Sequence, residues 1–405
     1  MPNYTILHGR RLIDGMSGAP IENPVILIQG SKIVSVGREG DMTVPQTEDV
    51  NRLDYKDKTL LPGLIDCHVH LCFSADDNPL ARAYEDSDDM MLLRSAHNAE
   101  VALKAGLTTL RDCGGRNHVT FSTKEAIKKV IIKGPRLLLS GRPITITGGH
   151  CFFLNGEADG VDDVRKLARR LIKEGADFLK IMASGGGMTP STVPKLPYYT
   201  VEELTVAAGE AHRLGRKIAA HCHSTQSIED VLEAGIDTIE HCSFLSPETG
   251  QRKFEPHIAE RIVANGTYVC ATMSAGRKSV RSTEQTDEYK LRLQQNMQDS
   301  NFSRMLEMGV KLIAGTDAGV TWTTFDNYPM YMELAVAGGM DNMQAIQSGT
   351  SLAAEALDIA DTVGTIQPGK EADIIAVDGN PLEDISLLWN VAMVMKAGEV
   401  VDIAK

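Results

Sequence analysis

The chain has 405 residues, of which 42% are hydrophobic, 23% charged and 5% aromatic, a composition typical of a globular protein with more than one domain. Lys and Arg number 41 against 54 Asp and Glu, so the formal net charge is −13, and no basic cluster interrupts this balance. These values exclude a small disulfide-stapled scaffold and argue against a nucleic-acid partner.

The two ends of the chain share a β-rich pattern. Residues 4–14 and 24–37 are short β-prone runs broken by Gly, Pro and Asn, which predicts antiparallel strands and hairpins. A similar pattern returns at 363–380 and 389–405. The sequence therefore predicts one small β-sandwich domain built from residues 1–59 and 361–405.

Residues 60–360 follow a different pattern, in which short apolar runs alternate with segments of helical period. One such helical segment starts at Thr200, an N-cap candidate three residues before Glu203. Runs that are apolar on both faces are what parallel strands covered by helices require. The eight strand candidates are 61–71, 107–113, 135–141, 176–184, 216–222, 237–243, 266–272 and 310–317. They predict an α/β fold with a (β/α)8 TIM barrel; a doubly wound sheet is disfavoured because no GxGxxG turn follows the first run.

Targeting signals and cysteines indicate the compartment. The first twenty residues lack the apolar core of a secretory signal, and no segment approaches the roughly 20 apolar residues that cross a bilayer. The seven cysteines are scattered without a CxxC pair, which is typical of free thiols in a reducing compartment. We therefore expect a cytoplasmic protein with no membrane partner.

Metal-binding residue types stand at the ends of the predicted strands, where barrels of this kind carry their reacting groups. His68 and His70 end the first run, and side chains two residues apart on a strand point the same way, so both can bind one divalent ion. Lys180 lies in the apolar fourth run, where an ammonium is costly unless it is paired or neutral. A neutral lysine can take up carbon dioxide as a carbamate that bridges two cations; the alternative is a lysine that reaches a carboxylate inside the barrel.

The remaining strand ends complete this set. His221 and His241 end the fifth and sixth runs, and Asp317 ends the eighth. With His68, His70 and Lys180 they are expected at one mouth of the barrel. These six residues supply three or four ligands to each of two metal ions and leave a position for a shared water.

The motifs around these residues resemble the amidohydrolase superfamily. Within it, the chain is similar to the metal-dependent peptidase branch of Xaa-Pro dipeptidase (prolidase-like) enzymes, with imidazolonepropionase more distantly related. The resemblance covers the whole chain, including the split β domain. The matching motifs are PGLIDCHVH at 62–70, TTLRDCGG at 108–115, GPRLLLSGRPITITGGH at 134–150, DFLKIMASGG at 177–186, AAHCH at 219–223, TIEHC at 238–242, GTD at 315–317 and PGKEADIIAVDGNPL at 368–382.

The resemblance implies a role for each ligand and a reaction. It places His68 and His70 on the more buried metal, carboxylated Lys180 between the two metals, His221 and His241 on the second metal, and Asp317 on the first. The two divalent ions are expected to be zinc. The reaction that the resemblance implies is attack of a metal-bridging hydroxide on the amide carbonyl of a dipeptide or N-acyl amino acid. Asp317 takes the proton of the bridging water and returns it to the departing amine. By analogy the protein forms a homo-oligomer.

Substrate contacts follow from the same resemblance. His150 is expected to donate to the substrate carbonyl or the developing oxyanion. His223 departs from the family pattern, because similar peptidases often have a tyrosine there that contacts the substrate. His223 is thus a substrate contact or a replacement for His221 as ligand. Tyr199 and Arg116 are candidates to hold a substrate carboxylate.

Three other functions are compatible with parts of this pattern. The same centre can hydrolyse cyclic amides, lactones or organophosphates, because fold and metals do not determine the acyl group. A mononuclear aminohydrolase is disfavoured, since such sites do not use a bridging lysine. A non-enzymatic, metal-free barrel scaffold is disfavoured because all six ligands are present.

Overall fold

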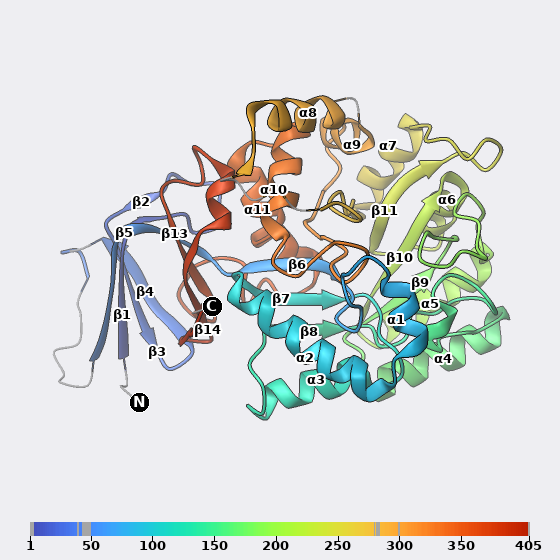
Figure 1. Ribbon diagram of the computed structural model, residues 1–405, viewed down its shortest axis with the longest axis horizontal. Helices are drawn as coiled ribbons and strands as arrows, with labels where there is room; N and C mark the ends of the chain where they lie inside the picture. The colour runs from blue at the N-terminus through green and yellow to red at the C-terminus, as the bar shows by residue number, and fades with distance from the viewer. Residues whose placement is uncertain are drawn as a thin grey trace.

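The computed structural model describes residues 4–38, 40–42, 50–278, 280, 284–298 and 300–403. Figure 1 shows two regions: a sheet at the left that contains the first and the last strands of the chain, and a larger region at the right in which helices lie outside parallel strands. The long strand β5 runs out of the first region and leads directly into β6 of the second.

The left-hand sheet joins residues from both ends of the chain. Its hydrogen-bonded order is β15-β14-β13-β5-β1-β3-β4, with β2 paired to β1. Strand β5 pairs in parallel with β1 and antiparallel with β13. The described strands form one sheet by this pairing, so the predicted sandwich of two sheets stays a prediction. The strands are β1 (Tyr4–Leu12), β2 (Ile21–Glu22), β3 (Pro24–Gln29), β4 (Lys32–Arg38), β5 (Val50–Pro62), β13 (Ile374–Asp378), β14 (Val391–Lys396) and β15 (Glu399–Val401).

Side chains on both faces of this sheet are buried. Ile26 and Ile28 alternate along β3 and join one apolar cluster, whereas Val25 and Leu27 between them join another. Alternation with period two places neighbouring residues on opposite faces of a strand. Strand β5 stays in this sheet as far as Pro62, beyond the predicted boundary at residue 59.

The right-hand region contains two parallel sheets, β6-β7-β8 and β12-β11-β10-β9. The α/β class with parallel strands is thereby confirmed. These strands correspond to seven of the eight predicted runs: β6 (Leu64–Val69), β7 (Leu107–Asp112), β8 (Arg136–Leu139), β9 (Phe178–Met182), β10 (Lys217–Ser224), β11 (Thr238–Leu245) and β12 (Tyr268–Cys270).

The eighth predicted run, 310–317, makes isolated bridges instead of a regular strand. Leu312 bridges Val269 of β12, and Ala318, the residue directly after the run, bridges Val69 of β6, both in parallel. On the other side, Ile144 bridges Ile181 of β9. Single bridges therefore span the gaps between the two parallel sheets.

Helices cover the outside of the parallel strands (Figure 1). The predicted N-cap at Thr200 is confirmed, because Thr200 and Glu203 form a capping box at the start of α5. The helices are α1 (Pro79–Glu85), α2 (Asp88–Lys104), α3 (Val119–Lys128), α4 (Gly160–Glu174), α5 (Val201–Arg213), α6 (Thr225–Glu233), α7 (Pro256–Asn265), α8 (Asp287–Met297), α9 (Asn301–Glu307), α10 (Tyr328–Ala337), α11 (Asn342–Ser348) and α12 (Ser351–Ala356), with 3₁₀ turns η1 (Phe152–Leu154) and η3 (Ile385–Trp389).

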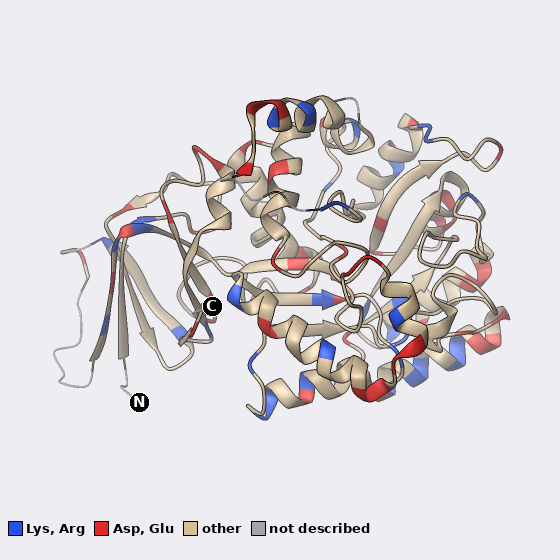
Figure 2. Cartoon of the chain, in the orientation of Figure 1, with Lys and Arg blue, Asp and Glu red and all other residues tan. Residues whose placement is uncertain are grey.

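Charged residues lie mainly on the outer helices, where Lys and Arg are interspersed with Asp and Glu along α2, α3 and α4 (Figure 2). None of the helices within the described ranges combines the length and the apolar character needed to cross a bilayer. All seven cysteines are buried and free, in agreement with the expectation of unpaired thiols.

Candidate active site

His68 and His70 stand together at the end of β6, as their spacing predicts. Both side chains are buried, and their ring centroids lie 5.3 Å apart. Asp317 faces both rings, with its Oδ1 3.5 Å from His68 Nε2 and 3.4 Å from His70 Nε2. The backbone N–H of Asp317 donates to the His68 carbonyl at 2.8 Å, so the chain before Asp317 runs against β6. His68, His70 and Asp317, which form the first group of predicted ligands, therefore lie close together.

Gly315 permits this close approach. A Cβ at position 315 would lie 2.3 Å from Cys270 Sγ and 2.9 Å from His68 Cβ, too close for any side chain. The absence of a side chain at Gly315 thus lets the segment carrying Asp317 lie directly against His68.

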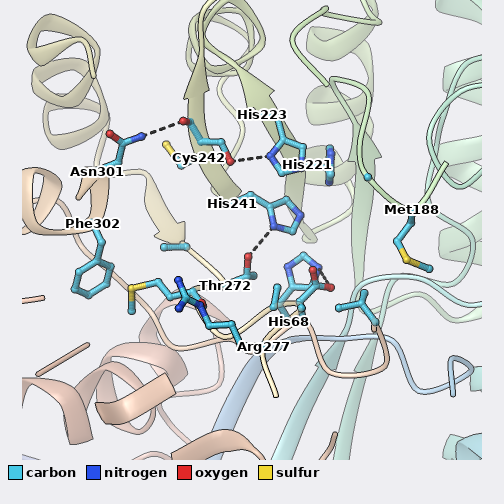
Figure 3. A pocket seen from close by; sticks show the side chains of 18 of the residues that line it. His68, Met188, His221, His223, His241, Cys242, Thr272, Arg277, Asn301 and Phe302 are labelled. Atoms are coloured by element: carbon cyan, nitrogen blue, oxygen red, sulfur yellow. Dashed lines mark hydrogen bonds and ion pairs between the residues drawn. The ribbon is translucent and has the colours of Figure 1, made fainter. Parts of the chain in front are cut away.

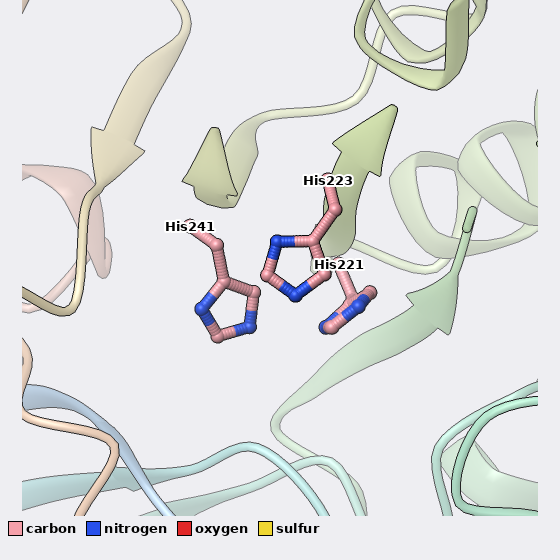
Figure 4. Close-up of side chains that lie close together, drawn as sticks. All are labelled: His221, His223 and His241. Carbon is pink, nitrogen blue, oxygen red and sulfur yellow. The ribbon is translucent and has the colours of Figure 1, made fainter. Parts of the chain in front are cut away.

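A second group contains His221, His223 and His241. His221 and His223 are two residues apart on β10, so they share one face, and His241 comes from the neighbouring β11 (Figure 4). The ring centroids are 4.5 Å (221–223), 4.6 Å (221–241) and 4.8 Å (223–241) apart. One ligand atom from each residue lies within 4.8 Å of the other two. His241 also lies close to His68, at 5.1 Å between centroids, so the two groups adjoin.

Each of these five histidines uses one ring nitrogen on a protein partner, which leaves its other nitrogen for the pocket. Such outer hydrogen bonds orient metal-binding imidazoles. The pairs are His68 Nδ1 with Glu240 Oε2 (2.6 Å), His70 Nδ1 with Gly114 O (3.1 Å), His221 Nε2 with Gly185 O (3.0 Å), His223 Nδ1 with Ser243 Oγ (2.7 Å) and His241 Nδ1 with Thr272 Oγ1 (2.7 Å). His221 therefore presents Nδ1, and the other four present Nε2.

Lys180 lies on β9 and lines the same pocket, with only 1% of its surface exposed. Within the described part of the chain, Lys180 has neither a hydrogen bond nor an ion pair. The alternative expected from the sequence, a lysine paired with a carboxylate inside the barrel, is therefore absent among the described residues. Its positive charge lowers the pKa of His68 in the first group and of His241 in the second, so the charge of Lys180 acts on both groups.

Burial determines the protonation of these groups. It lowers the pKa of His70 and of His223 to about 4. The charge of Lys180 also lowers the pKa of both residues, and the charge of Arg252 lowers that of His223 as well. The neutral imidazole that results is the form that binds metal ions. Burial raises the pKa of Asp317 to about 7, although Lys180 opposes this shift.

The backbone is strained where the site residues lie. His241 (φ 68°), Thr272 (φ 46°) and Asp317 (φ 64°) occupy the left-handed region, which is uncommon for residues with a side chain. Each costs about 1–3 kcal/mol and persists only where the surrounding structure holds it. His241 and Asp317 are predicted ligands, and Thr272 is the hydrogen-bond partner of His241. Backbone strain at such residues is typical of a functional site.

The two histidine groups face a cavity of about 490 Å³, a size that accommodates a small molecule. In Figure 3, Met188 and Phe302 lie on opposite sides of the histidines, and Arg277 lies between His68 and Phe302. The wall includes several flexible thioether side chains, those of Met182, Met188, Met273, Met297 and Met305.

His150 is part of this pocket, as the sequence predicts. Its ring centroid lies 4.5 Å from that of His221, and its buried Nδ1 has no hydrogen-bond partner among the described residues. Burial lowers the pKa of His150 well below its ordinary value, so the ring is neutral.

Two predicted substrate contacts lie elsewhere. Arg116 donates to Asp88 Oδ1 at 2.6 Å and to the carbonyl oxygens of Ala83 and Asp86, and it does not line the cavity. The Tyr199 hydroxyl is buried and donates to Ala158 O at 2.9 Å. The structure therefore brings neither residue to the pocket, because the polar groups of both are engaged by neighbouring helices and loops.

Sequence reasoning overlooked other residues of the site. Arg252 and Arg277 line the cavity, and both lie on loops that have no periodic pattern. Glu240 is fully buried and bonds His68 and Arg111, with 2.6 Å between Glu240 Oε1 and an Arg111 terminal nitrogen. A charge directly before His241 in an apolar run was the available signal for Glu240.

Comparison with known proteins agrees with this geometry. Residues 59–401 match the model of the amidohydrolase family. The chain is 30% identical to ochratoxinase of Aspergillus niger, over 98% of this chain and 86% of that protein. It is 21% identical to imidazolonepropionase of Geobacillus thermodenitrificans, over 94% and 90%. A crystal structure of a Xaa-Pro dipeptidase with bound methionine in the active site superposes with a TM-score of 0.84 at 31% identity, covering 98% of this chain and all of that one.

The resemblance inferred from the motifs is confirmed by these matches, which extend over nearly the whole chain. The chain belongs to the amidohydrolase family and is a hydrolase that acts on carbon–nitrogen bonds.

Proposed function

We propose that this protein is a binuclear zinc-dependent hydrolase that cleaves the amide bond of dipeptides or N-acyl amino acids. The position of Lys180 carries the proposal. Its amine is buried without a partner among the described residues, and its charge acts on both histidine groups. Such an amine is suited to take up carbon dioxide and to serve both groups as a carbamate.

The donor set fits two divalent cations. His68, His70 and Asp317 would hold one, His221 and His241 the other, and carboxylated Lys180 would contribute an oxygen to each. Neutral imidazoles together with carboxylate oxygens are ligands that zinc favours. The outer hydrogen bonds that leave one nitrogen of each histidine for the pocket support this assignment.

When bound, the two cations supply an activated water and polarise the scissile carbonyl. Asp317, which faces His68 and His70, takes a proton from that water and returns it to the departing amine nitrogen. The neutral ring of His150 donates to the carbonyl oxygen as negative charge develops there. Both side chains line one cavity, which supports their joint action on one substrate.

The lining of the cavity supports a substrate with a carboxylate and an apolar side chain. Arg252 and Arg277 line the cavity, and neither pairs with a carboxylate among the residues that the structure describes. A guanidinium binds a carboxylate through paired hydrogen bonds. The methionine-rich wall can adapt to apolar side chains of different shape. Dipeptides and N-acyl amino acids combine both features.

We also infer the finer architecture and the context of the protein. The bridges at Leu312, Ala318 and Ile144 support closure of the parallel sheets into a (β/α)8 barrel. Burial on both faces of the end sheet supports a sandwich-like second domain. A cytoplasmic location, a homo-oligomeric state and the absence of a nucleic-acid partner remain proposals from the sequence.

Metal analysis tests the centre. Protein loaded with zinc and bicarbonate should contain two zinc ions per chain, and Lys180→Ala should lose most of the metal and the activity. The exposed Lys166 on α4 provides the control, since Lys166→Ala should change neither. A small carboxylate such as acetate should restore part of both properties to Lys180→Ala, because it can fill the place of the carbamate. Full activity in metal-free protein would contradict the proposal.

A substrate panel tests the specificity. Dipeptides and N-acyl amino acids should be hydrolysed faster than the same compounds with the terminal carboxylate converted to a carboxamide. Lactams, lactones and organophosphates belong in the panel, since the same centre could act on them. A preference for these compounds, or equal rates for carboxylate and carboxamide, would exclude the dipeptidase assignment while leaving the metal centre intact.

A further inference from the structure

We propose that His223 is a third histidine ligand of the second metal ion and binds it together with His221 and His241. This inference rests on the proposed binuclear centre and adds a ligand to it. The two expectations from the sequence were a substrate contact or a replacement for His221. The geometry points instead to His223 acting beside His221.

The three rings form a nearly equilateral arrangement. Their centroids are 4.5, 4.6 and 4.8 Å apart, and one ligand atom of each lies within 4.8 Å of the others. Nitrogens that share a tetrahedral zinc at 2.0–2.1 Å lie roughly 3.4 Å apart. Shifts of about 1 Å would therefore bring all three imidazoles onto one ion.

His223 is anchored in the same way as His241. Each ring has its Nδ1 2.7 Å from a hydroxyl oxygen, Ser243 Oγ for His223 and Thr272 Oγ1 for His241, so each presents Nε2. The His223 backbone N–H donates to Ser184 Oγ at 2.9 Å, which holds the other side of the residue. An outer partner of this kind is what orients a metal-binding histidine.

A bulge in the sheet produces this anchor. The register between β10 and β11 shifts between Cys222 and Ser224, and on β11 Cys242 and Phe244 adopt left-handed φ values of 50° and 52°. The additional residues on β11 place Ser243 against His223 in the middle of the irregular segment. Such an irregularity is energetically costly, and bulges and strained residues of this kind are concentrated at functional sites. The position of Ser243 therefore supports a functional role for its contact with His223.

His150 provides the contrast. It also lies 4.5 Å from His221 between ring centroids, yet its buried Nδ1 has no hydrogen-bond partner among the described residues, and it is not part of the three-residue group. A pocket histidine that is not a ligand therefore lacks the anchor that His223 and His241 share. His150 and His223 are equally close to His221, so proximity does not distinguish them. The hydrogen bond at Nδ1, which only His223 of these two makes among the described residues, does.

Zinc stoichiometry and affinity test the inference without reference to activity. Wild-type protein, His223→Gln and His223→Tyr are loaded with zinc, and bound metal is measured by elemental analysis and by competition with a chromophoric chelator. Both variants should keep one tightly bound zinc and bind the second at least about tenfold more weakly. Cobalt(II)-substituted wild-type and variant proteins should differ in visible absorption, because the coordination of the second ion changes. Circular dichroism establishes that each variant is folded.

His150→Gln is the matched control, because it removes a neighbouring imidazole from the same pocket and should leave both the zinc affinities and the cobalt spectrum unchanged. Ser243→Ala, which removes only the anchor of His223, should weaken binding of the second zinc less than His223→Gln does.

Unchanged affinity and spectrum in both His223 variants, with a raised KM, would overturn the inference in favour of a substrate contact. Full zinc affinity in His221→Gln would overturn it in favour of replacement. Wild-type protein that binds fewer than two zinc ions would overturn the binuclear centre itself.

Discussion

The ring of His150 packs against the backbone at Gly186 so closely that a side chain there cannot be accommodated. A Cβ at position 186 would lie 2.4 Å from His150 Nε2, so Gly186→Ala must displace the imidazole. Because we propose that His150 donates to the substrate carbonyl, we expect kcat/KM to fall by about 10²- to 10³-fold. Zinc content should stay unchanged, since the proposed ligand set does not include His150. Steady-state kinetics together with elemental analysis check both parts.

The next residue provides the control. A Cβ at Gly187 would meet nothing within 4 Å, so Gly187→Ala makes the same chemical change on the same loop without touching His150. Its kcat/KM should remain within about twofold of the wild type. An equal loss in both variants would assign the effect to loop rigidity, and no loss in Gly186→Ala would exclude His150 from the chemistry.

Single side chains of the site were predictable where a strand determines them. His68 with His70, and His221 with His223, follow from the period of two along a strand that ends at the pocket. Arg116 was not predictable in this sense, because its guanidinium is taken by Asp88 and two carbonyl groups, a contact that only the folded chain contains. Loop residues have no period, so sequence patterns do not indicate which of them reach the cavity.

The same distinction applies to whole elements. Seven of the eight predicted runs form strands because they are apolar on both faces, a pattern that local sequence contains. The run 310–317 has this composition too, but it makes only isolated bridges. Gly315 lies against His68, and Asp317 adopts a left-handed φ of 64° that turns it toward the histidines. The contact with His68 and the turn at Asp317 thus interrupt the run, although its composition favours a strand.

Helices α4 and α5 are joined by a carboxylate that should make stability depend on pH. Glu210 on α5 accepts two hydrogen bonds from Arg169 on α4, at 2.9 and 2.8 Å, and these bonds, with help from Arg213, lower its pKa to about 2 from an ordinary value of 4.5. A lowered pKa in the folded state contributes stability above about pH 4.5, and this contribution is lost as the pH falls toward 2.

We therefore expect Glu210→Gln to lower the free energy of unfolding by about 1 kcal/mol at neutral pH, because the partners are partly exposed to solvent. The difference from wild type should shrink at about pH 3 and below. Urea unfolding at both pH values measures it. Glu260→Gln on α7, an exposed carboxylate for which the described residues offer no partner, should show almost no difference at either pH. A Glu210→Gln effect that does not change with pH would contradict the assignment.

At the scale of the whole molecule, the end sheet and the parallel strands are joined by an ion pair whose carboxylate is buried. Asp373, which precedes β13, lies 2.7 Å from a terminal nitrogen of Arg136 on β8, and its side chain is only 3% exposed. The other oxygen of Asp373 accepts from the backbone N–H of Ala397, and its carbonyl accepts from Gly63 between β5 and β6. One residue thus connects both chain ends to the first parallel sheet.

Arg136→Met should accordingly destabilise the whole protein. It would leave the Asp373 carboxylate buried without its counter-ion, a loss on the order of 3 kcal/mol, whereas Asp373→Asn together with Arg136→Met should recover part of this loss. A double-mutant cycle by urea unfolding then gives a coupling energy of about 1–3 kcal/mol between the two sites. Lys58 and Asp378 are the matched pair, because they join β5 to β13 within the end sheet at 2.6 Å but the Asp378 side chain is 58% exposed, against 3% for Asp373. Their coupling should be much weaker. Equal coupling in the two pairs would mean that the contact between the two regions depends on apolar packing. Asp373 would then have no special part in holding the end sheet against β6, the strand that carries His68 and His70.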